Sequence, residues 1–435
     1  MNHIEFYALF PFIGMLLFIA IGPLLFDRWW EDNRNKLIVS VGLSIPTVIY
    51  LHMKGNLMIH LEHQILYDYF PFIILLAALF IVTGGIHLSG NIEAKPRVNT
   101  AFLAVGYLLA SIMGTTGAAM LLIRPLITTN SERKFKAHTI LFFIAVVANC
   151  GGLLTPLGDP PLFLLYLRGA PFTWFLSLFP QWLFVGVLLL LIYYFVDVHY
   201  YKKESCSAIL KDSTETTRIR FGGRINLIYL VGVVLSVAFI NEGFIPSMKE
   251  HGAPMYITFL REIALLSLAV ASLITTSKKV RRLNSFTWDP ILEVAFLFLG
   301  IFVTMTPALL FLEERATLMG LDKSWEFFYG TGSLSAFLDN APTAVAFHQI
   351  GASLVGLMPG VKLVGGVAEP FLSAIAVGSV LFGSMTYIGN GPNFMVKTIA
   401  EAHKIPMPSF FAYIFKFSFV VLLPIYVLVQ LIFIH

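Results

Sequence analysis

The chain has 435 residues, of which 57% are hydrophobic, 14% aromatic and only 12% charged. Soluble domains usually carry about 25% charged residues, so this composition excludes a water-soluble globule of this size. The formal net charge of +4 does not indicate a nucleic-acid-binding protein, because the basic residues lie in short segments between apolar runs.

Long apolar runs follow one another from the N-terminus to the C-terminus. They predict membrane-spanning helices, because about 20 apolar residues cross roughly 30 Å of hydrocarbon. The alternating segments typical of a membrane β-barrel are absent. The first run lacks a basic leader and a small-residue cleavage site, so we interpret it as mature protein. We predict an all-α polytopic membrane protein with spans at 8–26, 37–53, 65–89, 139–168, 173–196, 225–242, 256–276, 289–312, 367–401 and 409–434.

Two further apolar segments, 101–127 and 325–355, are interrupted by small, polar or helix-breaking residues. The interruptions read Gly-Thr-Thr-Gly at 114–117 and Asp-Asn-Ala-Pro-Thr at 339–343. If both segments are re-entrant hairpins, 19 of the 29 Lys and Arg residues sort to one side of the membrane. Positive charge marks the cytoplasmic side, so we predict two hairpins and a cytoplasmic linker at 197–224.

The chain also repeats a short motif, T-x-x-G-[D/N]-x-P-x-F. It occurs at 155–163 and again, 231 positions later, at 386–394. Each copy follows an interrupted segment, and each half then contains an odd number of crossings. The pattern predicts two inverted repeats, 1–196 and 225–435, each with a hairpin and a broken helix (139–168 and 367–401). Matching interruptions in two halves are the best sequence indication of a transporter's binding site.

Each copy of the motif places glycine and proline in the middle of an apolar segment. Proline removes a backbone donor, and glycine permits nonhelical dihedral angles. A helix that breaks here exposes carbonyl groups at one half-helix end and N–H groups at the other, and these groups can hold an ion. The alternative is a proline kink that serves packing alone. The predicted breaks lie at Gly158, Pro160, Gly389 and Pro392.

Asp159 and Asp339 are the two acids deepest in the interrupted segments. A carboxylate at the centre of a bilayer costs at least about 2.5 kcal/mol, so such a group usually has a function there. A helix N-cap is the structural alternative for both residues. Hydroxyl and amide oxygens nearby suit Na⁺ or Li⁺, which prefer hard oxygen ligands. The candidate ion ligands beside the two acids are Asn340, Asn390, Thr155, Thr343, Thr386, Thr115 and Thr116.

Arg124 and Lys397 are cationic candidates near the same segments. Either side chain could pair with a carboxylate of a substrate. Each also lies near the predicted cytoplasmic end of its segment, where a long side chain can reach the lipid headgroups. We favour that role, or pairing with an internal acid, over substrate binding.

The hairpins, the broken spans and the tip Leu338-Asp339-Asn340-Ala341-Pro342-Thr343 resemble the ion transporter superfamily. The tip is most similar to NhaD-type sodium/proton antiporters, and the chain also looks like the "putative citrate transport" relatives grouped with them. Carboxylate carriers of the superfamily have Ser-Asn-Thr at both tips, a feature that this chain lacks. The resemblance implies a scaffold and a transport domain, often in a homodimer.

We therefore expect a secondary transporter of the cytoplasmic membrane that exchanges Na⁺ or Li⁺ for H⁺, with the cation near Asp159 and Asp339. The alternative is a cation-coupled symporter for citrate-like di- or tricarboxylates. A channel or sensory membrane protein is a third possibility, which the paired breaks disfavour. No nucleophile–base motif, metal cluster or nucleotide loop indicates an enzyme, so we expect no cofactor. The expected partners are the bilayer, a small cation and the proton.

The charge distribution predicts that 90–100, 128–138, 197–224 and 277–288 all face the cytoplasm. Single cysteines placed in 90–100 and 128–138, in a background without Cys150 and Cys206, should resist a membrane-impermeant thiol reagent in intact cells. Labelling of 128–138 from outside, with 90–100 protected, would mean that 101–127 crosses the membrane fully.

Overall fold

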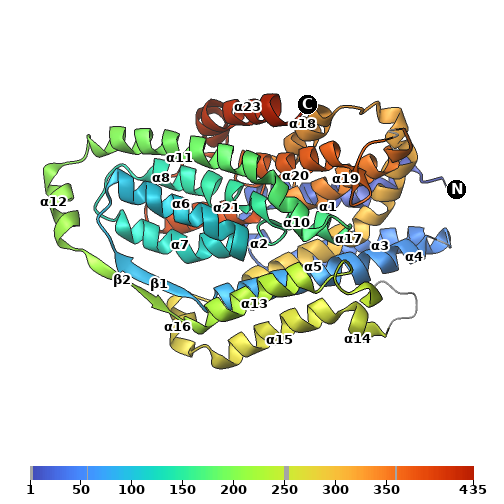
Figure 1. The fold of residues 1–435 in the computed structure, drawn as a ribbon, viewed down its shortest axis with the longest axis horizontal. Helices are drawn as coiled ribbons and strands as arrows, with labels where there is room; N and C mark the ends of the chain where they lie inside the picture. The colour runs from blue at the N-terminus through green and yellow to red at the C-terminus, as the bar shows by residue number, and fades with distance from the viewer. Residues whose placement is uncertain (1–2, 56, 249–253, 358–359) are drawn as a thin grey trace.

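The computed structural model describes residues 3–55, 57–248, 254–357 and 360–435. Within these residues, eight helices are long and apolar enough to cross a membrane, which confirms the all-α polytopic class. Figure 1 shows an elongated bundle with α12, β1, β2 and α16 at one end and α4 and α14 at the other. The eight candidate spans are Phe6–Pro23, Asn33–Met53, Met58–Thr83, Pro96–Met113, Ala137–Leu154, Phe172–Tyr201, Asp289–Met319 and Phe410–Phe433.

The first three spans overlap the predicted apolar runs, with differences at their ends. The predicted span 65–89 starts and ends too late, because the helical span begins at Met58 and α5 ends at Thr83, where Gly84 and Gly85 follow. The next residues form strand β1 (His87–Asn91), which pairs with β2 (Thr217–Gly222) of the linker. The elements before β1 are η1 (Phe6–Leu9), α1 (Phe10–Leu25), α2 (Asp27–Trp30), α3 (Asn33–Met53), α4 (Met58–His63), the π-helix η2 (Gln64–Tyr69) and α5 (Phe70–Thr83).

The interrupted segment 101–127 is part of a helix pair, α6 (Pro96–Met113) and α7 (Thr115–Thr129). Gly114 joins the two helices with φ of 80°, a value that side-chain-bearing residues rarely adopt. The pair returns to the end at which it starts, because Asn99 and Asn130 exchange hydrogen bonds of 2.9 and 3.1 Å. The segment 325–355 has the same form, with α18 (Ser324–Ser335) packed on α19 (Asn340–Ser353).

The predicted spans 139–168 and 367–401 are both discontinuous. The first comprises α8 (Ala137–Val146), η3 (Cys150–Leu154) and, after a nonhelical stretch, α9 (Pro160–Leu167). The second comprises α20 (Glu369–Gly383) and α21 (Gly391–Ala402), with nonhelical residues between them. Residues around Gly158 and Gly389 are therefore outside regular helix. The inverted relation of the two halves remains a prediction.

The linker 197–224 contains more regular structure than its polarity suggests. Residues 197–201 still belong to α11 (Phe179–Tyr201), and α12 (Cys206–Thr214) follows. The remaining elements between α9 and α20 are α10 (Phe172–Phe175), η4 (Leu176–Leu178), α13 (Ile225–Phe239), η5 (Pro246–Met248), α14 (Met255–Thr258), α15 (Leu260–Thr275), α16 (Lys278–Leu283), α17 (Asp289–Arg315), η6 (Ala316–Met319), η7 (Val355–Leu357), β3 (Leu363–Val364) and β4 (Val367–Ala368). The chain ends with α22 (Phe410–Tyr413), the π-helix η8 (Ile414–Leu422) and α23 (Leu423–Phe433).

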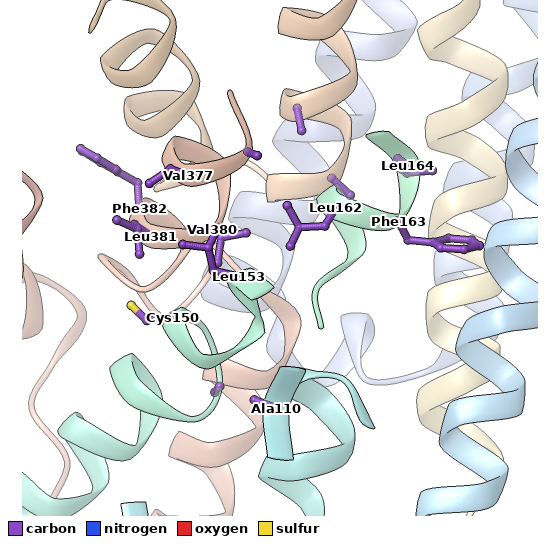
Figure 2. Packing of buried hydrophobic residues seen from close by; sticks show 14 of the residues in the cluster. Ala110, Cys150, Leu153, Leu162, Phe163, Leu164, Val377, Val380, Leu381 and Phe382 are labelled. Carbon is purple, nitrogen blue, oxygen red and sulfur yellow. The ribbon is translucent and has the colours of Figure 1, made fainter. Parts of the chain in front are cut away.

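The hydrophobic core is centred on the two discontinuous spans. α20 packs on both η3 and α9, and the three elements contribute the fully buried side chains Leu153, Leu162 and Val380, drawn in Figure 2. Almost the whole of α20 is buried. Close packing of this kind holds the nonhelical stretches in one conformation, because a packed interior tolerates little displacement.

A buried charge cluster anchors the loop after α7 to α11. The guanidinium of Arg133 lies 2.6 Å from Asp197 Oδ1 and 3.8 Å from Glu204 Oε1, and all three side chains are almost fully buried. His138 Nε2 lies 2.8 Å from the same Asp197 oxygen. Glu204 also accepts hydrogen bonds from the backbone N–H groups of the loop. The cluster therefore fixes the end of the α6–α7 pair.

The Arg133→Met substitution should lower the free energy of unfolding by about 3–5 kcal/mol, because it leaves buried carboxylates without their cation. Lys211→Met is the matched control. Lys211 pairs with Glu132 at 2.9 Å but is 54% exposed, so water screens the pair and its loss should cost much less than the loss of Arg133. Chemical unfolding in detergent micelles measures both. Equal effects would mean that the buried cluster is not an anchor.

Candidate functional site

Asp159 lies at the centre of a cluster of polar groups from four segments. Its side chain is 2% exposed. Its oxygen atoms accept hydrogen bonds from Thr115 Oγ1 at 2.8 Å, Asn340 Nδ2 at 2.6 Å and Asn390 Nδ2 at 3.0 Å. Thr115 begins α7, Asn340 begins α19, and Asn390 immediately precedes α21. Both helix pairs and both discontinuous spans therefore meet at one carboxylate.

Local sequence explains how the first helix pair reaches this carboxylate. Pro160 and Pro161 start α9 directly after Asp159, since proline suits the first turn of a helix. The turn at Gly114 places the backbone N–H of Thr115 2.8 Å from the carbonyl oxygen of Gly158. The tip of the pair is thus bonded to the broken span through the backbone as well as through a side chain.

Close glycine contacts recur at equivalent positions in the two halves. A Cβ added at Gly158 would overlap the carbonyl oxygen of Gly152. A Cβ added at Gly389 would lie 2.6 Å from the carbonyl oxygen of Gly383, a distance too short for any side chain at Gly389. In both halves the two glycines are separated by six positions. Glycine is therefore needed at each break because the backbone folds onto itself there.

At each break, a threonine hydroxyl donates a hydrogen bond to the backbone of the neighbouring helix pair. Thr155 donates a hydrogen bond to the carbonyl oxygen of Ser111, near the end of α6. Thr386 donates to the carbonyl oxygen of Ala336, at the end of α18, at 2.5 Å. Thr155 and Thr386 thus hold the backbone in place, and neither is hydrogen-bonded to Asp159 in the described structure.

Two asparagines that the sequence analysis did not single out extend the cluster. Asn390 donates to Asn149 Oδ1 at 3.2 Å, and Asn149 in turn donates to Asn393 Oδ1 at 2.6 Å. Asn393 donates to two backbone carbonyl oxygens of its own broken span. The sequence alone gives little indication that these two asparagines belong to a site. Asn149 follows an apolar run, and Asn393 occupies the motif position at which the first copy has the buried Leu162.

Asp339 is the N-cap residue of α19. Its Oδ1 accepts the backbone N–H of Ala341 at 3.0 Å, which satisfies a free donor at the start of α19. Thr343 donates to the carbonyl oxygen of Asp339 at 2.9 Å. Neither residue is hydrogen-bonded to Asp159. The structure therefore brings together Asp159, Thr115, Asn340 and Asn390, and leaves Asp339 and Thr343 at the adjacent helix start.

The two cationic candidates lie outside the cluster. Arg124 donates to the backbone carbonyl oxygen of Asn284 at 3.4 Å. Lys397 pairs with Glu401 one turn later in α21, at 3.1 Å. Neither side chain is hydrogen-bonded to Asp159, whose three partners are all uncharged.

A pocket leads to the cluster between α5, α7, α9 and the start of α17. Thr115, Thr116 and Asp159 supply its polar side chains, and leucine, phenylalanine, proline and valine form most of the remaining wall. The first two residues of α9 are prolines, so this half-helix presents few N–H groups to an anion. In the described ranges, no group of three His, Cys, Asp or Glu residues could hold a metal. A small monovalent cation or a proton suits this site better than a polyanion.

One family model matches almost the entire chain. The model of the family described as "Putative citrate transport" matches residues 1–434. The chain belongs to this family. No curated protein matches it significantly. Together with the apolar helices, membership establishes a multi-pass membrane protein of a transport family, which is consistent with the expectation that it is not an enzyme.

The Gly158→Ala and Gly389→Ala substitutions should each destabilise the protein by about 1–3 kcal/mol or more, because the new methyl group meets backbone that cannot move aside. Gly391→Ala is the matched control, since a Cβ there meets no atom within 4 Å. Thermal unfolding in detergent measures the differences. Unchanged melting of Gly158→Ala would contradict the close backbone contact.

Proposed function

We propose that the chain exchanges Na⁺ or Li⁺ for H⁺ across the cytoplasmic membrane, as a secondary transporter with alternating access. One observation carries the proposal: a buried carboxylate, Asp159, has only uncharged hydrogen-bond partners. An unpaired carboxylate in an apolar interior gains from binding either a proton or a cation. The two would compete for the same oxygen atoms, so binding one releases the other.

The neighbouring groups suit such an exchange. Asn340 Oδ1 is buried and has no hydrogen-bond partner in the described structure, so it is a free oxygen ligand beside Asp159. Thr115 and Asn390 can also turn an oxygen towards a cation, since a hydroxyl and an amide can each donate or accept. Such oxygen donors suit a hard cation. We include Asp339 in the proposed cation region, because it directly precedes Asn340 in the sequence.

Alternating access requires that the cluster open to one side at a time. The donors to Asp159 come from the tips of both helix pairs and from the break before α21. A movement of these segments relative to the surrounding helices would therefore change both the access to Asp159 and its hydrogen bonds. A bound cation or proton neutralises the carboxylate, which lowers the cost of keeping it buried during that movement.

Citrate-like symport is the second candidate, and the description of the family favours it. In that case Asp159 would bind the coupling cation, and the substrate carboxylates would need donors elsewhere. Candidate donors are the N–H groups at the start of α7 and the side chains of Arg124 and Lys397. Citrate-driven uptake in the assay below would decide for this candidate.

Asp159→Asn should abolish Na⁺-driven proton movement, since only the carboxylate supplies the full charge for which a cation and a proton compete. The amide preserves the size of the side chain but cannot titrate. Asp339→Asn should also lose exchange while keeping its helix cap. Proteoliposomes with an internal pH dye, given Na⁺, Li⁺, K⁺ or citrate in turn, measure the flux.

Arg124→Gln and Lys397→Gln are the controls for charge loss, and both should retain exchange. An unchanged Na⁺-dependent pH response in Asp159→Asn would contradict the proposed mechanism. Loss of citrate uptake in the Arg124 and Lys397 variants, with no Na⁺-driven proton movement in the wild type, would establish the symport alternative.

A further inference from the structure

The linker strand and the helix before α17 carry a group of exposed basic side chains. None of these side chains makes an ion pair or a hydrogen bond within the described structure. No acidic residue occurs in 217–224 or in 278–283. The group, called the basic surface below, consists of Arg218, Arg220, Arg224, Lys278, Lys279 and Arg282.

The two basic segments form one surface because they pack on each other. Gly222 and Gly223, at the end of β2, lie against the side chain of Val280 in α16. Strand β2 is held in place by β1, with Arg220 opposite Ser89. Figure 1 shows β2 and α16 together at the same end of the molecule.

The basic surface lies where two lipid-facing helices end. Arg224 directly precedes α13, and Lys278 follows α15 after two residues, while α13 and α15 pack side by side. The outer faces of these helices carry exposed apolar side chains, as expected beside hydrocarbon. Examples are Ile228, Val231, Val270 and Ile274, which are 65%, 56%, 51% and 78% exposed. Basic side chains at the ends of helices with apolar outer faces are expected at the depth of the lipid headgroups.

Exposed aromatic and apolar residues accompany the charges. Phe221, Leu283 and Trp288 are 50%, 51% and 48% exposed, respectively. Aromatic side chains favour the boundary between hydrocarbon and water. In strand β2, Arg218 and Arg220 alternate with Ile219 and Phe221, so that charged and apolar side chains point to opposite faces.

We propose that the basic surface binds the headgroups of anionic phospholipids in the adjoining leaflet. Six cations without an ion-pair partner among the described residues complement the negative charge of such headgroups, and clusters of four to eight basic residues beside a span are typical of anionic-lipid sites. Arginine in addition forms paired hydrogen bonds to phosphate oxygens.

Hydrogen bonds connect the residue that follows α16 to α7, the helix whose first residue belongs to the candidate functional site. Asn284, directly after α16, donates to the carbonyl oxygen atoms of Gly84 and Ile86 at 2.8 and 2.6 Å. Its own carbonyl oxygen accepts the bond from Arg124 of α7, whose first residue is Thr115. Lipid bound at α16 and β2 thus stabilises the end of the first helix pair, and thermal stability reports its binding.

The test titrates phosphatidylglycerol into the purified chain in a nonionic detergent and follows the melting temperature. The wild type should be stabilised by phosphatidylglycerol and not by phosphatidylcholine, and added salt should weaken the effect. The variant R218Q/R220Q/K278Q/K279Q should raise the apparent Kd for phosphatidylglycerol about tenfold or more. The matched control R97Q/K202Q/K404Q/K416Q removes four exposed basic side chains elsewhere and should keep the wild-type Kd.

Three results would overturn the proposal. Equal stabilisation by phosphatidylcholine would show that the headgroup charge is irrelevant. An equal rise in Kd in both variants would show diffuse attraction instead of a defined surface. Stabilisation of the same size by inorganic phosphate would assign the surface to a soluble anion. A variant that melts normally without lipid but no longer responds to phosphatidylglycerol supports the lipid site.

Discussion

The burial of the Asp159 carboxylate is the constraint on which the rest of the structure depends. A charged group in an apolar interior is costly unless hydrogen bonds or an ion compensate it. Asp159 receives three hydrogen bonds, and their donors come from both helix pairs and from the second break. No single segment could supply them. The helix pairs must therefore end close to the breaks, and the surrounding helices hold them there through extensive apolar packing.

The backbone makes this meeting possible. Helices cannot end inside a bilayer unless their free N–H and C=O groups find partners. At the first break, the carbonyl oxygen of Gly158 accepts the N–H of Thr115, and in both halves a threonine hydroxyl donates to a carbonyl oxygen near the C-terminal end of the first helix of the adjoining pair. Glycines permit the approach because any side chain would collide with the backbone. The contacts that give hydrogen-bond partners to the free backbone groups at the helix ends thus also position the polar groups around Asp159.

Much of this arrangement could be predicted from the sequence, because interruptions of apolar segments are visible in a single chain. The motif copies located both breaks, and the charge distribution indicated that 101–127 turns back on itself. Partnerships across long separations could not be predicted. Asn149 and Asn393 occupy positions where a buried apolar residue would also fit, and only the fold places them together. Asp339 looked equivalent to Asp159, yet its backbone position makes it a helix cap. The pairing of β1 with β2 was missed because both strands are short and polar.

We propose that a cation and a proton compete for Asp159. The most direct measurement adds NaCl to the purified protein in weakly buffered detergent solution and records proton release with a pH dye. We expect Na⁺ and Li⁺ to release protons from the wild type, choline to release none, and Asp159→Asn to release none with any of these cations. Proton release of wild-type size from Asp159→Asn would contradict the proposal.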